Sequence, residues 1–235
     1  MNDATPGPDR PVIGTYHDII IPAGPHLRRG IVDSILAGRY ERNEIALGLA
    51  CIKPGARILE LGAGAGIVGA ILARHCKPAA MVSVEANPRL IPHIRRLHEV
   101  NGLTDQINLR HCIVSSAPDA PKTVTFHLRK NFLGSALTAD PDGLSEAVEV
   151  PVVPYARLTR NFAHDTIMMD IEGAELDFLR HAKLGHINTF VAEFHRRIFG
   201  REGIQECRHL LRRAGLVLDT DLTHADVHVF QRPQA

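Results

Sequence analysis

The chain has 235 residues, 45% of them hydrophobic, which is long enough to bury a sizeable core in one α/β domain. Its 27 Lys and Arg residues balance 26 Asp and Glu residues, and the net charge of +1 gives no overall attraction to nucleic acid or anionic membranes. The four cysteines lack zinc-site or disulfide-framework spacing, and no apolar run approaches the roughly 20 residues that span a bilayer. We therefore expect a soluble, cytoplasmic protein.

The first 52 residues are expected to form a tail and a helical cap before the main domain. The first ten are polar and rich in proline, so we expect them to be frayed. From Pro25 to Cys51 the apolar residues recur at helical spacing, with a break near Gly38, which predicts two helices. Turn residues at 53–55 then begin a domain that we expect to run from 53 to 235.

From residue 56 onward, strand and helix patterns alternate along the chain. ARILELGAGAG predicts a buried strand that enters a glycine turn, and IVGAILARHC predicts the helix after it. MVSVEA, PRLIPHIRRLHEVNG and INLRHCIVS continue the pattern as strand, helix and strand. Alternation of this kind indicates a parallel sheet with crossover helices.

The regular pattern is interrupted at about 115–165, which we interpret as an insertion. TVTFHL and EVPVVP are short strand-like pieces, and the polar stretch between them includes Lys130, Asn131 and Ser135, which are candidates for substrate contacts. The alternation resumes with TIMMDIEG and ends in two closing strands, LVLDT and DVHVFQR. The predicted fold is a Rossmann-like, doubly wound, seven-stranded and mostly parallel sheet with an antiparallel last strand.

The segment ELGAGAG, residues 60–66, carries the clearest signal of ligand binding. Glycines at 62, 64 and 66 let the backbone turn sharply and approach a ligand closely, and the next helix points its N-terminal amides at that ligand. Glu85 ends the following strand, where an acid accepts hydrogen bonds from ribose hydroxyls. The two features together favour a nucleotide-like ligand over glycines that serve packing alone.

The spacing in this turn differs from that of a dinucleotide site, because Ile67 stands where that fingerprint has a third glycine. A carboxylate at Glu60 would also repel a pyrophosphate, whereas it suits a ligand with ammonium and sulfonium charges. The sequence therefore favours S-adenosylmethionine over NAD as the cofactor.

These motifs resemble those of class I S-adenosylmethionine methyltransferases and, more closely, of the FkbM family. The likeness covers about residues 40 to 200 and includes YERNE at 40–44, DIEGAE at 170–175 and EFH at 193–195. VEVPVVPYARL and NFLGSAL are similar to the family's lead-in to the fourth strand and to its serine-containing loop. The resemblance implies the class I methyltransferase fold and O-methylation of a hydroxyl on a sugar or secondary metabolite.

The acids of MMDIEGAE follow a buried strand, where an unpaired charge is costly unless it is paired or takes part in chemistry. We expect Asp170, Glu172 and His195 to face the acceptor, with Asp170 or His195 removing its proton. A divalent metal that holds the acceptor oxygen is an alternative. Glu175 is explained by a place in the first turn of a helix, where an acid favours the positive end of the dipole.

Cofactor contacts are expected from the glycine turn, the strand-end acid and the first motif. These residues are Glu60, Gly62, Ala63, Gly64, Gly66, Glu85, Ala86 and Glu41. Glu41 and Glu44 lie three apart, so on a helix they would share one face. The expected partner is a small-molecule acceptor, with no nucleic acid and no membrane. N-methylation, an NAD-dependent oxidoreductase and a non-catalytic cofactor-binding protein are the alternatives.

Overall fold

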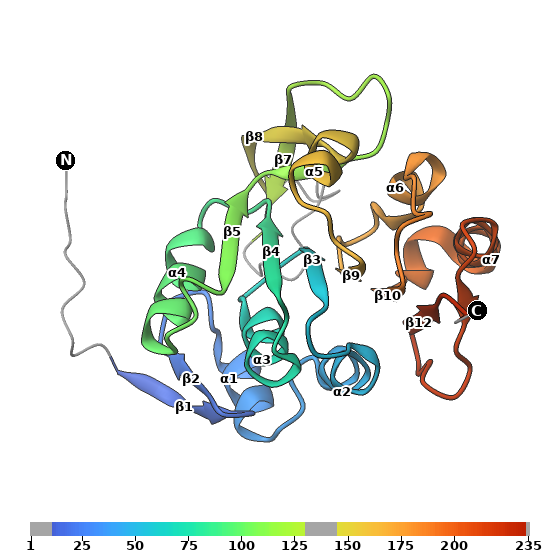
Figure 1. Ribbon diagram of the computed structural model, residues 1–235. Helices are drawn as coiled ribbons and strands as arrows, with labels where there is room; N and C mark the ends of the chain where they lie inside the picture. The colour runs from blue at the N-terminus through green and yellow to red at the C-terminus, as the bar shows by residue number, and fades with distance from the viewer. Residues whose placement is uncertain (1–10, 130–144, 234–235) are drawn as a thin grey trace.

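The structure is a computed structural model that describes residues 11–129 and 145–233. At its centre lies a seven-stranded sheet with the order β11-β12-β10-β9-β3-β4-β5 (Figure 1). The strands are β3 (Arg57–Leu61), β4 (Ala80–Glu85), β5 (Ile107–His111), β9 (Thr166–Met169), β10 (Thr189–Glu193), β11 (Val217–Leu218) and β12 (Val227–Gln231). Pairing is parallel from β5 to β10, and β12 is antiparallel to both of its neighbours. The predicted Rossmann-like sheet with an antiparallel last strand is confirmed.

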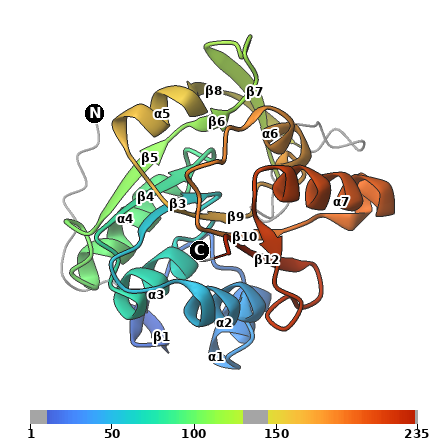
Figure 2. The same ribbon diagram turned by 45° about the vertical axis from the view of Figure 1, so that its right-hand side comes forward.

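Helices cover both faces of this sheet, because the strands alternate apolar side chains between two cores. Ile58 packs into one core and Leu59 into the other. The first core is covered by α1 (Arg29–Leu36), α2 (Arg42–Cys51), α3 (Ile67–Cys76) and α4 (Ile91–Val100). The second is covered by α5 (Tyr155–Asn161), α6 (Glu175–His181) and α7 (Arg196–Arg213), and Figure 2 shows the two groups on opposite sides.

The N-terminal segment contains the two predicted helices and also a hairpin that sequence analysis missed. Strands β1 (Val12–Tyr16) and β2 (Ile19–Pro22) pair antiparallel through a turn at His17 and Asp18, both with positive φ. The side chain of Asn101 bonds to the backbone of Ile20, which ties the hairpin to the end of α4. The hairpin was missed because its first strand alternates only weakly and its turn contains no glycine.

The predicted strand INLRHCIVS is broken into two strands that belong to different sheets. It bends at Cys112, so that β5 stays in the main sheet while β6 (Ile113–Ser115) pairs with β8 (Glu146–Pro154). β7 (Thr123–Leu128) pairs with the other edge of β8 and completes a three-stranded sheet. The interval at 115–165 therefore contains regular structure among its described residues, including both predicted short strands.

Strand register aligns three residues of the predicted site in one row with Glu193. Leu61 pairs with Val84 and with Met169, and Met169 pairs with Ala192. The next positions along the four parallel strands are Gly62, Glu85, Asp170 and Glu193. Because parallel strands end at one edge of the sheet, this register brings together residues that are up to 131 positions apart in sequence.

Candidate active site

A cavity of about 440 Å³ opens at this edge of the sheet. Its wall includes the turn after β3, the ends of β4 and β9, the segment after β5, and the start of α2. Seven of the predicted cofactor residues line it, namely Glu41, Glu60, Gly62, Ala63, Gly64, Glu85 and Ala86. Asp170 and Glu172 also lie on its wall.

The glycine turn is held against the end of β9 by contacts that need glycine. Gly62 has φ +87, and a Cβ added there would overlap the carbonyl oxygen of Asp170. The amides of Gly62 and Ala63 both bond to the carbonyl of Val84 at 3.0 Å. Gly66 has a different role, because it is outside the cavity wall and precedes α3 with φ +77, against the side chain of Ile94. Gly66 thus shapes the turn without facing the cavity.

Glu85 is fixed at the cavity by the backbone around it. Its two carboxylate oxygens accept the amides of Gly64 at 2.8 Å and Asn87 at 2.7 Å. Burial raises the pKa of Glu85 to about 7, although these backbone hydrogen bonds favour the charged form. A carboxylate oxygen accepts more than one hydrogen bond, so Glu85 remains able to bind ribose hydroxyls.

Glu60 lies deeper, within β3, and its carboxyl group is already bonded inside the protein. It accepts a hydrogen bond from the hydroxyl of Ser83, and a Cβ added at Gly69 would collide with its oxygens. Burial raises the pKa of Glu60 to about 7, while the bond from Ser83 opposes that rise. Glu60 therefore contributes negative charge at the base of the cavity and braces β3 against β4 and α3.

The acidic stretch forms a cluster around His195, which lies between β10 and α7. The Nδ1 atom of His195 is 3.0 Å from Oε1 of Glu175. Its Nε2 atom is 3.3 Å from Oε2 of Glu172 and 3.7 Å from Oδ1 of Asp170. The structure thus brings together the three residues predicted to face the acceptor, with Asp170 and Glu172 on the cavity wall and His195 behind them.

These contacts decide the charge of the imidazole. Burial lowers the pKa of His195, but hydrogen bonds to Glu172 and Glu175 and the charge of Asp170 outweigh it and raise the pKa to about 11. His195 is therefore an imidazolium at neutral pH and donates from both nitrogens. In that state the ring has no free lone pair and acts only as a hydrogen-bond donor.

Burial has the opposite effect on the pKa of Asp170. Burial raises the pKa of Asp170 well above its ordinary value, and the nearby charges of Glu193 and Glu172 add to the effect. The charge of His195 opposes it. A carboxylate whose pKa is raised is more basic than an ordinary aspartate, which is a property of general bases.

A second group of acids lies beside the first. Oxygen atoms of Glu41, Glu44 and Glu193 lie within 4.8 Å of one another. Burial raises the pKa of Glu41 and of Glu44 to about 7, and Glu44 shares a hydrogen bond with Glu193. The sequence predicted that Glu41 and Glu44 share one face of a helix, but Glu41 precedes α2, with φ 43. The side chain of Glu41 therefore approaches Glu44 from a turn and not from the helix.

Two other acids make contacts that the sequence did not predict. Glu172 lies before α6, in a turn with φ 51. Its carboxylate reaches His195. Glu175 does begin α6, as predicted, but it also bonds to His195. Sequence patterns alone cannot show this contact, because the two residues belong to different strand-helix connections.

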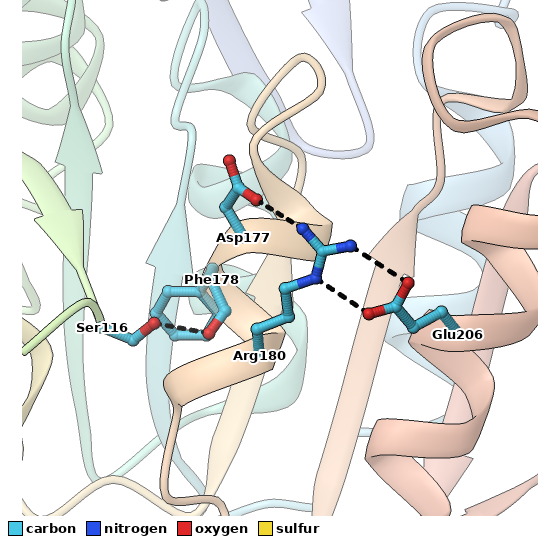
Figure 3. A network of polar contacts seen from close by, with 5 residues as sticks. All are labelled: Ser116, Asp177, Phe178, Arg180 and Glu206. Carbon is cyan, nitrogen blue, oxygen red and sulfur yellow. Dashed lines mark hydrogen bonds and ion pairs between the residues drawn. The ribbon is translucent and has the colours of Figure 1, made fainter.

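Residues of α6 and of the segment after β6 also line the cavity, and Figure 3 shows the polar contacts that hold these elements together. The hydroxyl of Ser116 donates to the carbonyl of Phe178 at 2.6 Å. Arg180 bonds to Asp177 and forms two hydrogen bonds, of 2.8 and 3.1 Å, to Glu206 on α7. These contacts tie α6 to both neighbours and hold its cavity face in place.

Sequence analysis missed several residues that line the cavity. Tyr40, Phe126, Phe178 and Ser115 line the cavity and were not among the predicted cofactor or catalytic residues. Phe178 is three residues after Glu175 on α6, and that helical spacing is the signal from which it was predictable. Lys130, Asn131 and Ser135, which sequence analysis named as substrate contacts, lie outside the described residues.

Comparison with known proteins supports the same chemistry. A family model described as protein-L-isoaspartate(D-aspartate) O-methyltransferase matches residues 42–115, which include the glycine turn and Glu85. S-adenosylmethionine is the supported cofactor. Methyl transfer from this cofactor is the activity that the match supports. No curated protein matches the chain.

Solved structures share the fold at low sequence identity. An uncharacterized protein from Listeria monocytogenes serotype 4b has a TM-score of 0.50 and 12% identity, over 81% of this chain and 67% of that chain. Precorrin-6y C5,15-methyltransferase from Geobacter metallireducens GS-15 has a TM-score of 0.48 and 10% identity, over 83% of this chain and 89% of that chain. TYW2 from P. horikoshii, in complex with MeSAdo, has a TM-score of 0.45 and 13% identity, over 81% of this chain and 60% of that chain.

The residues of the cavity fit S-adenosylmethionine. Glu85 and the turn at Gly62 to Gly64 suit the ribose and a close backbone approach, and the carboxylates of Glu41 and Asp170 face a cavity that would contain sulfonium and ammonium charges. The cofactor supplies the methyl group. Among the described residues, no helix is both long enough and apolar enough to cross a membrane.

Proposed function

We propose that the protein is an S-adenosylmethionine-dependent O-methyltransferase that acts on a hydroxyl of a sugar or secondary metabolite, as its resemblance to the FkbM family implies. The observation that carries this proposal is the position of Asp170. It follows β9 in the row next to Gly62, it lines the cofactor cavity, and burial raises its pKa. Such a carboxylate is suited to take a proton from an acceptor beside the methyl donor.

Each residue then has a defined task. Gly62, Ala63, Gly64, Glu85 and Ala86 hold the cofactor, with Glu41 near its amino-acid end. Asp170 accepts the proton of the acceptor hydroxyl, which raises the rate by about 100-fold to 10,000-fold for a positioned base. His195, as a cation, offsets the charge of Asp170, and Glu172 contacts the same ring nitrogen of His195 at 3.3 Å. The remaining acceleration comes from alignment of donor and acceptor.

The charge of the cavity favours a neutral or cationic acceptor over a polyanion. Glu41, Glu44, Glu85, Asp170 and Glu172 all line it, and the nearby Arg180 is already paired with Glu206. A phosphate group would be repelled by these carboxylates. This supports a small-molecule acceptor and opposes both a nucleic-acid acceptor and the pyrophosphate of NAD.

The test is calorimetric titration of the protein with S-adenosylhomocysteine and, separately, with NAD. We expect micromolar binding of the first ligand, loss of that binding in Glu85→Ala, and no binding of NAD. The control is Glu99→Ala, an exposed acid on α4 outside this cavity. NAD binding, or S-adenosylhomocysteine binding that Glu85→Ala leaves intact, would contradict the proposal. A screen of hydroxyl acceptors follows, with release of S-adenosylhomocysteine as the readout.

A further inference from the structure

Glu175 is more completely buried than any other acid of the cluster. Its side chain is 0% exposed, compared with 30% for Asp170 and for Glu172. One carboxylate oxygen, Oε1, accepts hydrogen bonds from the amides of Ile171 and Gly173, both at 3.2 Å. The same oxygen is 3.0 Å from Nδ1 of His195. A fully buried carboxylate persists only when such donors compensate its lost hydration.

The turn that these bonds hold is conformationally unfavourable by itself. Glu172 has φ 51 and Gly173 has φ 102, and a left-handed conformation is costly for a residue with a Cβ. The side chain of Ile198, in the first turn of α7, packs directly over Gly173. The turn is therefore held by hydrogen bonds to the carboxylate of Glu175 and by packing of Ile198 on Gly173.

We propose that Glu175 is a positioning residue: its carboxylate fixes both the turn and the imidazole of His195, so that Nε2 of the ring faces Asp170 and Glu172. The three bonds at one oxygen connect the end of β9 to the end of β10. Glu172 and Asp170 contact Nε2 of the ring and Ile198 covers Gly173, but among these groups only Oε1 of Glu175 contacts both the turn and Nδ1 of His195.

The catalytic consequence rests on the proposed function. Glu175 orients the ring as a buried acid orients a histidine in other hydrolytic and transfer sites, and the ring then holds its positive charge 3.7 Å from Oδ1 of Asp170. The structural part of the proposal stands apart from this step, because the state of the His195 ring is measurable without any substrate.

The competing explanation is that Glu175 only stabilises the N-terminus of α6. The helix offers a matched control, because Asp177 is the other acid in its first turn and its side chain is 84% exposed. An effect of the helix dipole predicts similar results for Glu175→Gln and Asp177→Asn, since each removes one negative charge. A positioning role predicts that only Glu175→Gln changes His195.

The experiment is ring-nitrogen NMR of the protein with labelled histidine, with the His195 signals assigned from a His195→Asn variant. In the native protein we expect both ring nitrogens to be protonated at pH 7.5 and Nδ1–H to be hydrogen bonded. In Glu175→Gln we expect the titration midpoint of His195 to fall by at least about one pH unit. In Asp177→Asn we expect a change below about 0.3 units. His195 is also faced by Glu44 from α2 and Glu193 from β10, so both remain unchanged in all variants.

Three outcomes overturn the proposal: an unprotonated Nδ1 in the native protein, equal shifts in the two variants, or no shift in Glu175→Gln. The first is read on the native protein, so it holds even when Glu175→Gln fails to fold. Methyl transfer gives a separate readout, with kcat expected to fall in Glu175→Gln while affinity for S-adenosylhomocysteine is kept. Absence of methyl transfer in the native protein would count against the proposed function and would leave the ring measurement intact.

Discussion

Gly62 lies so close to Asp170 that the space for its missing side chain is filled by the carbonyl oxygen of Asp170. The two residues follow adjacent parallel strands, and the amide of Asp170 bonds to the carbonyl of Leu61 at 2.9 Å. The cofactor turn and the proposed base are thus one packed unit. Any change that separates the two backbones should affect both cofactor binding and chemistry.

We therefore expect Gly62→Ala to be severely damaging. The turn requires a positive φ at residue 62, which is strained for alanine, and the new methyl group displaces Asp170. The two effects together should cost more than about 3 kcal/mol of stability. Gly102→Ala is the matched control, because Gly102 has φ +63 but nothing within 4 Å of its added Cβ. It should cost only about 1 kcal/mol. Urea denaturation of both variants measures the difference, and equal losses would show that strain alone matters.

Asp170→Asn separates binding from chemistry. The amide keeps the size of the side chain but cannot accept the acceptor's proton, so we expect kcat to fall by about 100-fold to 10,000-fold. Affinity for S-adenosylhomocysteine should stay within about threefold, because this ligand lacks the sulfonium charge and its ribose is held by Glu85. Asp105→Asn, an exposed acid in the loop before β5, is the control. A full rate in Asp170→Asn would assign the base to another residue.

Stability of the cofactor-free protein should fall as pH rises from 6 to 8. Burial raises the pKa of Glu41, Glu44, Glu60 and Glu85 to about 7 from an ordinary value of 4.5. The folded state therefore binds protons more tightly than the unfolded state, and this stability is complete below about pH 4.5 and is lost as pH rises through 7. His195, with a raised pKa, contributes in the same direction.

Thermal melting in buffers from pH 5 to pH 9 tests this dependence. Glu44→Gln removes one of the titrating groups and should flatten the decline, whereas Glu99→Gln, on the exposed side of α4, should not. Saturating S-adenosylmethionine should also flatten it, because its positive charges favour the ionised carboxylates. A melting temperature that rises between pH 6 and pH 8 would contradict the sign of these shifts.

Ser83→Ala tests the support beneath the cofactor turn. Ser83 donates the hydrogen bond that offsets the burial of Glu60, and its removal leaves a buried carboxyl group with one fewer partner. We expect a loss of about 1–3 kcal/mol in stability and a higher pKa for Glu60. Ser34→Ala, in α1 outside both the cavity wall and this contact, is the control. Equal stability of the two variants would show that Ser83 adds nothing to the support of Glu60.

The main sheet was predictable because its signals are local. The strands Arg57–Leu61 and Ala80–Glu85 are apolar runs that turn signals bound, and the helices between them have regular periodicity. The break at Cys112 was not predictable, because INLRHCIVS has one continuous strand pattern and the bend depends on pairing with β8. The hairpin at Val12–Pro22 was missed for a related reason. The side chain that holds it in place is Asn101, which bonds to Ile20 from about 80 residues further along the chain.

Sequence by itself determined the residue types of the site and the edge of the sheet at which they lie. Glu85 ends a strand and Gly62, Asp170 and His195 follow strands, and parallel strands must end at one edge. Only the tertiary structure decided their charges and roles. The pKa of His195 depends on Glu172 and Glu175, and that of Asp170 depends on burial and on Glu193. Electrostatic effects of this kind depend on distances of a few ångströms between side chains, and residue spacing along a chain does not specify such distances.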